Sequence, residues 1–164
     1  MGLFKPYQFL SSVDKVDLEQ LAADGFDCIL LDMDNTVLPR DTEVVPDSII
    51  EWISRAKEMG FKLSFVSNNW HGYVFDRAAK LGLPIVHKAM KPFPLAYHIA
   101  KRRLGCKRKA TVSIGDQLMT DVFGSRLAGI KPILVLPQAT KDLPHTLFLR
   151  KIERLILKDA KPTR

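Results

Sequence analysis

Two carboxylates, Asp32 and Asp34, follow directly after the apolar run at residues 28–31. The run has the composition of a buried strand, so both acids lie where a strand ends and a loop begins. Because alternate side chains of extended backbone share one side, the two carboxylates can face one substrate or metal ion. Turn and cap chemistry explains residues 34–36 equally well. This stretch alone therefore leaves catalysis and a structural turn as equal alternatives.

Further polar side chains stand where other strand-like segments end. These residues are Ser67, Asn68, Lys91 and Asp116. In an open parallel sheet, ligands bind beyond the carboxyl ends of the strands, near the point where the strand order reverses. Convergence of these independent placements on one sheet edge favours a catalytic site over a turn.

Acids, a hydroxyl and an ammonium at one edge suit phosphoryl transfer, in which positioning and charge neutralisation supply most of the rate. One carboxylate can attack phosphorus and form an aspartyl-phosphate. A second carboxyl can protonate the leaving oxygen and then deprotonate the attacking water. Asp32 and Asp116 supply the oxygen ligands that Mg²⁺ prefers. A lysine such as Lys91 offsets the repulsion between an anionic nucleophile and an anionic substrate.

Strand-like and helix-like segments alternate along the chain. The predicted strands are 28–31, 62–67, 85–86, 111–114 and 133–136, and the predicted helices between them are 46–60, 72–81, 93–104 and 121–128. The alternation, with nearly continuous apolar strands, predicts an α/β fold. We expect a Rossmann-like three-layer sandwich with a mostly parallel sheet of about five strands and helices on both faces.

Length and composition favour one domain over residues 1–164, since 164 residues with 46% hydrophobic and 26% charged side chains are ordinary for a globular chain. Its core is expected at 27–136, with an N-terminal helix at 14–24 and an amphipathic C-terminal helix at 145–158. Two cysteines and no long apolar segment predict a cytoplasmic protein. The net charge of +7 favours anionic partners.

Four ordered motifs resemble those of the haloacid dehalogenase (HAD) superfamily. They are Asp32-Met33-Asp34-Asn35-Thr36, Ser67, Lys91 and Gly115-Asp116-Gln117-Leu118-Met119-Thr120-Asp121. The sequences of the first and last motifs, together with the compact size of the chain, resemble those of the capless YqeG-type branch (class IIIA). That branch is similar to phosphatidylglycerophosphate phosphatases. The resemblance implies an HAD-type fold and a phosphatase.

The resemblance also implies a role for each motif residue. Asp32 resembles the nucleophile, and Asp34 resembles the general acid and base. The implied cofactor is Mg²⁺, held by Asp32, Asp116 and Asp34 through its backbone carbonyl. The residues implied in binding the substrate phosphate are Ser67, Asn68, Lys91 and Thr36, with Asp121 supporting Lys91 or the metal site. Asp121 can alternatively do no more than favour the positive end of a helix.

The segments after Thr36 and after Ser67 are too short to hold a cap domain, so we expect an open site. By resemblance, an open site suits a large phosphorylated substrate, and phosphatidylglycerophosphate is favoured. The alternatives are a soluble phosphate ester, phosphotransfer to another hydroxyl, and a basic nucleic-acid-binding or assembly protein without catalysis. The sequence does not determine the oligomeric state.

Two basic segments carry their own alternatives. The run at 101–109 holds six cations, which can bind an anionic surface or form a solvated helix end. The helix at 145–158 can dock on the domain or bind an anionic membrane peripherally at its inner face. For Trp70 and His71, packing or a solvated loop is favoured over contact with substrate or membrane.

Overall fold

The computed structural model describes residues 2–139, 150, 151, 153, 155–157 and 161–163. Its centre is one six-stranded sheet in the order β1-β6-β5-β2-β3-β4, with every neighbouring pair parallel. The strands are β1 (Gln8–Leu10), β2 (Cys28–Leu31), β3 (Lys62–Val66), β4 (Ile85–Val86), β5 (Thr111–Gly115) and β6 (Lys131–Val135). The predicted parallel α/β fold is confirmed.

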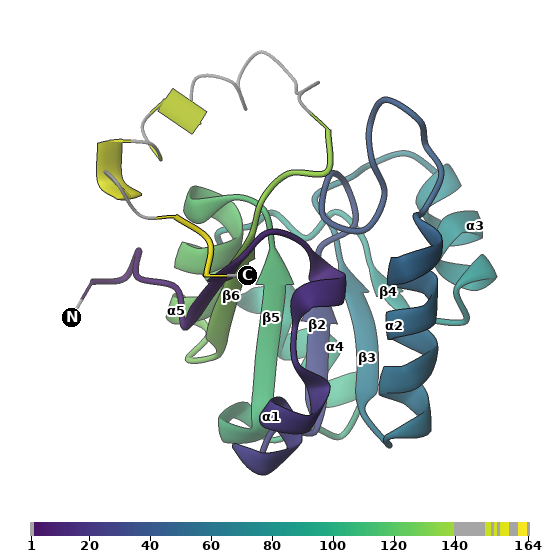
Figure 1. The fold of residues 1–164 in the computed structure, drawn as a ribbon, viewed down its shortest axis with the longest axis horizontal. Helices are drawn as coiled ribbons and strands as arrows, with labels where there is room; N and C mark the ends of the chain where they lie inside the picture. Colours follow the sequence, from purple (N-terminus) through teal and green to yellow (C-terminus); the bar gives the residue numbers. More distant parts are fainter. Residues whose placement is uncertain (1, 140–149, 152, 154, 158–160, 164) are drawn as a thin grey trace.

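Helices cover both faces of this sheet. They are α1 (Leu18–Ala23), α2 (Asp47–Glu58), α3 (Tyr73–Lys80), α4 (Leu95–Arg103) and α5 (Phe123–Leu127), with short turns at Val13–Lys15, Arg108–Ala110 and Leu118–Val122. Figure 1 shows α1 and α2 in front of the sheet and α4 behind it. The N-terminal helix predicted at 14–24 is observed as the short turn Val13–Lys15 followed by α1. The helix predicted at 121–128 begins earlier, because the turn at 118–122 runs into α5.

Strand β1 is an addition to the predicted sheet. It is three residues long, it lies at the edge of the described sheet and pairs with β6, and two of its residues are half-buried. So short a strand carries too few alternating positions for a period of two to be recognised in the sequence. Its position is decided by its pairing with β6.

The two faces of the sheet bury two separate cores because neighbouring strand residues point in opposite directions. Ile29 and Leu31 of β2 pack in the core under α1, α2 and α3. Cys28 and Leu30 pack in the core under α4. The burial of all four residues explains why β2 reads as a continuous apolar run rather than an alternating one.

The strand order reverses next to β2. The chain passes from β2 to β3 and β4 on one side, and then returns to place β5 and β6 on the other. The carboxyl ends of β2 and β5 therefore flank the crevice in which sheets of this kind bind ligands. Helix α4 begins near the carboxyl ends of the strands and runs back along the sheet. The basic run at 101–109 therefore lies near the opposite end of the sheet, where β5 begins.

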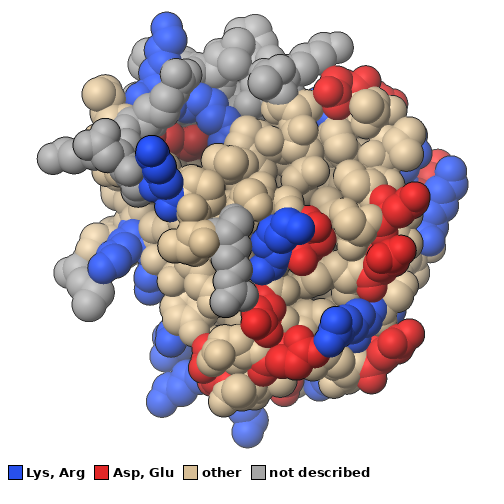
Figure 2. Space-filling view, in the orientation of Figure 1, with Lys and Arg blue, Asp and Glu red and all other residues tan. Residues whose placement is uncertain are grey.

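Acidic side chains gather on another surface. Figure 2 shows them, mixed with some Lys and Arg, over the face that carries α1 and α2. Helix α2 contributes Asp47, Glu51 and Glu58, while Arg55 pairs with Glu19 of α1. The positive net charge of the chain is therefore not spread evenly over its surface.

The predicted helix at 145–158 lies mostly outside the described residues. Where the structure describes this segment, residues 150, 151, 153 and 155–157 are helical. Leu157 packs beside the small core formed by Leu118, Val122 and Leu134. Leu155 is exposed. Across the described ranges, no helix is both long enough and apolar enough to cross a membrane.

Candidate active site

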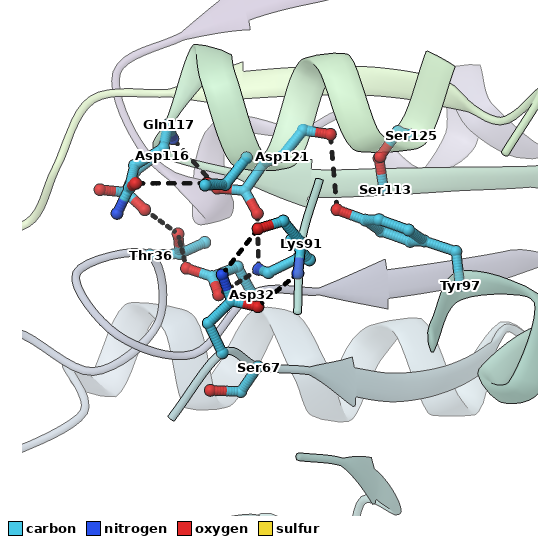
Figure 3. Close-up of polar contacts among 12 residues, drawn as sticks. Asp32, Thr36, Ser67, Lys91, Tyr97, Ser113, Asp116, Gln117, Asp121 and Ser125 are labelled. Carbon is cyan, nitrogen blue, oxygen red and sulfur yellow. Dashed lines mark hydrogen bonds and ion pairs between the residues drawn. The ribbon is translucent and has the colours of Figure 1, made fainter. Parts of the chain in front are cut away.

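The centre of the site joins the ends of β2 and β5. The backbone N–H of Asp32 donates to Ile114 O at 2.9 Å, which extends the pairing of the two strands by one residue. The Thr36 hydroxyl lies 3.0 Å from Asp32 Oδ2 and 2.9 Å from Asp116 Oδ1 (Figure 3). All three residues are buried. Thr36 therefore holds together two carboxylates that are far apart in the sequence.

Lys91 brings a buried ammonium to this centre. Its Nζ lies 2.7 Å from Asp32 Oδ1 and 2.6 Å from Asp121 Oδ1 (Figure 3). The loop that carries it has positive φ at Lys88 (49°) and Met90 (54°), which residues with side chains adopt only where the surrounding structure holds them. Lys91 thus follows directly after a residue with positive φ, and its side chain points inward to the two carboxylates.

Asn68 holds the backbone of Lys91 in place. Its side-chain Oδ1 accepts from Lys91 N at 2.7 Å, and its Nδ2 donates to Lys91 O at 3.2 Å. The neighbouring Ser67 is fully buried, and its hydroxyl accepts from Asn69 N at 3.1 Å. The structure thus places Ser67 and Asn68, two of the four predicted phosphate-binding residues, in the loop that follows β3, with their side chains bonded to backbone.

Asp34 lies on the more open side of the site. It is half-buried, and its Oδ2 accepts from Asn69 Nδ2 at 3.0 Å. Asn69 was not predicted, although its position directly after Ser67 and Asn68 at a strand end was the available signal. Burial, followed by the nearby charge of Asp32, raises the pKa of the Asp34 carboxyl above its usual value. A raised pKa suits a group that must donate a proton.

A cavity of about 650 Å³ opens over these groups. The residues that line it are Asp32, Asp34, Arg40, Asn68, Asn69, Trp70, His71, Tyr73, Met90, Lys91, Gln117, Thr120 and Asp121. Ser67, Thr36 and Asp116 are buried residues outside this lining. His71 stacks on Tyr73 with ring centroids 5.9 Å apart. The cavity therefore combines an acidic floor with an aromatic wall.

The buried charges perturb one another strongly. Burial opposes the charged form of Lys91, but the carboxylates of Asp121 and Asp32 outweigh it and raise its pKa well above the usual value. Burial raises the pKa of Asp121 to about 6, although Lys91 opposes the rise. Burial and the charge of Asp32 raise the pKa of Asp116 as well. The site therefore holds more carboxylates than its own cations neutralise easily.

Three carboxylates are close enough to share a cation. Oxygen atoms of Asp32, Asp116 and Asp121 all lie within 4.8 Å of one another. Such a hard, all-oxygen donor set fits Mg²⁺, which takes one or two carboxylates and completes its shell with water and phosphate oxygens. Asp121 was predicted only to support the site. The side chain of Asp34 lies outside this group, and its implied ligand was the backbone carbonyl.

Two residues of the C-terminal segment also reach the site. The Arg150 guanidinium pairs with the Asp116 carboxylate and also donates to Asp116 O. Glu153 is buried and accepts from Leu118 N at 2.6 Å and Met119 N at 3.3 Å. In the sequence both belonged to a charged amphipathic pattern that gave no sign of these contacts. Contacts between residues that lie more than thirty positions apart in the sequence depend on tertiary packing.

Gly115 leaves room for Asp121, and this gives a test of the site's packing. A methyl group on Gly115 would stand 2.6 Å from Asp121 Oδ2, well inside contact distance. We expect Gly115→Ala to lower the free energy of unfolding by about 1–3 kcal/mol and to displace Asp121 from Lys91. Chemical denaturation measures the change. Gly72→Ala is the control, because a methyl group there meets nothing within 4 Å; equal stability of the two variants would contradict the expectation.

The parallel sheet with carboxylates at its reversal point is the arrangement of a Rossmann-like enzyme, and the buried Lys91 beside them suits phosphate chemistry. A family model described as HAD-hydrolase-like matches residues 89–154. A protein of Bacillus subtilis (strain 168), named as the probable phosphatase YqeG, is 37% identical over 158 residues, which is 96% of this chain and 92% of that relative. The chain therefore belongs to the HAD-like hydrolase family. The predicted class, an HAD-type phosphatase, is confirmed.

Two more distant similarities agree with this assignment. An Arabidopsis thaliana protein named phosphatidylglycerophosphate phosphatase 1, chloroplastic/mitochondrial, is 24% identical over 93% of this chain and 46% of its own length. The structure of the 3-deoxy-D-manno-octulosonate 8-phosphate phosphatase of Moraxella catarrhalis, in complex with magnesium ion, phosphate ion and KDO, superposes with a TM-score of 0.56. It is 19% identical over 86% of this chain and 90% of that one. This second similarity supports the fold.

Proposed function

We propose that the chain is a magnesium-dependent phosphomonoesterase that works through an aspartyl-phosphate on Asp32 and acts on a lipid phosphate, with phosphatidylglycerophosphate favoured. The observation that carries the proposal is the contact of Asp32 with the buried Lys91 ammonium at the floor of an open cavity that also holds Asp34. We infer that the enzyme is cytoplasmic and meets its substrate at the inner membrane face.

The first step transfers the phosphoryl group to the enzyme. A carboxylate oxygen of Asp32 attacks phosphorus, and the bond from phosphorus to the ester oxygen breaks. Asp34 donates its proton to the leaving oxygen, which departs as an alcohol. Lys91 neutralises charge on the nucleophile and on the incoming phosphate, so the two anions can approach each other. We propose that the Asn68 amide, which lines the cavity, contacts the transferring phosphate, and that Ser67 contacts it from beneath that lining.

The second step releases phosphate. Water attacks phosphorus of phospho-Asp32, the bond to the Asp32 oxygen breaks, and Asp34 takes the proton from the water. Asp32 and Asp116, with the carbonyl of Asp34 and the nearby Asp121, would hold Mg²⁺. A bound Mg²⁺ would supply charge neutralisation on the phosphate oxygens. Thr36 keeps the carboxyl groups of Asp32 and Asp116 in register through both steps.

Two observations support a large, lipid-like substrate. No cap domain covers the cavity among the described residues, because short loops follow both β2 and β3. Two of the relatives, those of Arabidopsis thaliana and Chlamydomonas reinhardtii, carry the name phosphatidylglycerophosphate phosphatase. An open cavity admits the phosphate of an amphiphile while its chains stay outside.

The test is phosphate release from a panel of substrates. With Mg²⁺, we expect detergent-dispersed phosphatidylglycerophosphate to be hydrolysed with a kcat/KM well above that of sugar phosphates and nucleotides. Chelation with EDTA should lower every rate by about 10²-fold or more, and added Mg²⁺ should restore it. The reverse substrate order would assign a soluble phosphate ester. Activity that is unchanged in EDTA would contradict the proposed metal dependence. RNA binding without any hydrolysis would contradict the proposed phosphatase activity.

A further inference from the structure

Large apolar side chains are exposed beside the mouth of the cavity. Trp70, Met90, Phe93 and Leu95 are each between 61% and 66% exposed. We name these four residues the apolar rim. Trp70 and Met90 also line the cavity, and Phe93 N donates to Met90 O at 3.0 Å. Exposed apolar side chains that gather beside a ligand cavity, rather than scatter singly, indicate a surface with a partner.

The apolar rim is built on two loops that are hydrogen-bonded to each other and on Leu95, the first residue of α4. Lys88 N donates to Asn69 O at 3.2 Å, and Ala89 N donates to Ser67 O at 3.0 Å. The Lys88 ammonium lies 5.0 Å from the centre of the Trp70 ring, which is a cation–π contact. These bonds join the loop after β3 to the loop after β4. The apolar rim is therefore presented by fixed backbone next to Lys91.

The charge around the apolar rim points to an anionic partner. Residues 70–95, which carry all four of its side chains, contain four Lys and Arg and a single acidic residue. Lys88 stands directly at the rim, and Arg40 lines the cavity. Exposed aromatic and apolar side chains together with cations are the composition that binds the interface of an anionic bilayer. On the face with α1 and α2, by contrast, acidic side chains are mixed with the cations (Figure 2).

We propose that the apolar rim inserts into the surface of an anionic lipid bilayer and so places the cavity over phosphate esters in that surface. This proposal rests on the lipid-phosphatase function proposed above and assigns the enzyme's membrane contact to residues beside the site. The basic run at 101–109 lies near the end of the sheet where β5 begins, whereas the rim lies at the carboxyl ends of the strands. The run therefore cannot lie as close as the rim to a bilayer that covers the cavity. Insertion at the rim leaves the lipid chains in the bilayer and brings only the phosphate to Asp32.

Vesicle flotation without substrate tests the contact directly. We expect the wild-type protein to float with vesicles of phosphatidylcholine and phosphatidylglycerol and to bind phosphatidylcholine vesicles more weakly. The variant F93Q/L95Q, which leaves the cavity lining intact, should lose about tenfold or more of the binding. The control M59Q/L127Q changes two exposed apolar residues, one directly after α2 and one at the end of α5, near the opposite end of the sheet, and should bind as the wild type does.

Three results would overturn the proposal: no binding of the wild type to either vesicle, equal binding by F93Q/L95Q, or loss of binding only in K101Q/R102Q/R103Q. The last result would assign the contact to the basic run. Circular dichroism of each variant verifies folding.

Kinetics separate this proposal from the proposed function. F93Q/L95Q should hydrolyse water-soluble p-nitrophenyl phosphate at the wild-type rate and lose activity only on vesicle-borne phosphatidylglycerophosphate. Equal loss on both substrates would overturn the membrane role. If the wild type binds vesicles through the rim but hydrolyses neither substrate, the proposed function fails while the contact stands.

Discussion

Asp32→Asn is expected to abolish turnover of every phosphate ester, with kcat lowered by about 10⁴-fold or more. The amide of Asn cannot attack phosphorus to form an acyl phosphate, so the first step of the reaction is lost. The change keeps the size of the side chain and removes one charge from a buried cluster. The folded state should therefore persist, and steady-state phosphate release measures the effect.

Phosphoenzyme trapping makes this result specific to the nucleophile. Acid-quenched reactions with a labelled substrate should give label on the wild-type protein and none on Asp32→Asn. Asp27→Asn is the matched control, since Asp27 is an exposed aspartate just before β2 and should retain full activity. Full turnover by the Asp32 variant, or equal labelling of both proteins, would refute the aspartyl-phosphate mechanism.

Lys91→Met is expected to affect both catalysis and stability. It removes the ammonium from between Asp32 and Asp121 and leaves buried carboxylates without that partner. We expect kcat to fall by about 10²–10³-fold, as for the loss of one electrostatic contact to the reacting phosphate. Without divalent metal, the free energy of unfolding should fall by about 3–5 kcal/mol, because an uncompensated charge stays buried.

A second variant separates the two roles of Lys91. Lys91→Met/Asp121→Asn removes one buried carboxylate together with the ammonium, so much of the lost stability should return while kcat stays low. Denaturant titration and initial rates are measured on the same preparations. Lys80→Met, at an exposed lysine of α3, is the control for loss of a surface charge. Recovery of kcat in the double variant would show that Lys91 acts only through packing and charge balance.

The proposed membrane contact and the proposed chemistry meet in one loop. Lys91 neutralises charge at the floor of the cavity, while Met90 and Phe93 on either side of it are exposed. Under these two proposals, one short segment serves both the anionic reacting group and the surface that carries it. A site with no cap among the described residues would then act on an amphiphile without enclosing its chains.

The sequence by itself determined the parallel α/β fold and the identity of the motif residues. Apolar periodicity is local, so it located β2 and β5 and showed that Asp32 and Asp116 follow them directly. The carboxyl ends of parallel strands lie at one edge, which made the convergence of these acids predictable. The strand β1 escaped prediction because three edge residues, two of them half-buried, carry too little pattern.

Only the tertiary structure decided which groups touch. The strand order puts β5 beside β2, and this lets Thr36 bridge two carboxylates. The inward turn of Lys91 depends on positive φ in its loop, and the Arg150 contact with Asp116 depends on packing of the C-terminal segment. The exposure of Phe93, just before α4, is likewise a property of the folded chain. Long-range contacts and exposure arise from the arrangement of elements, which local periodicity does not encode.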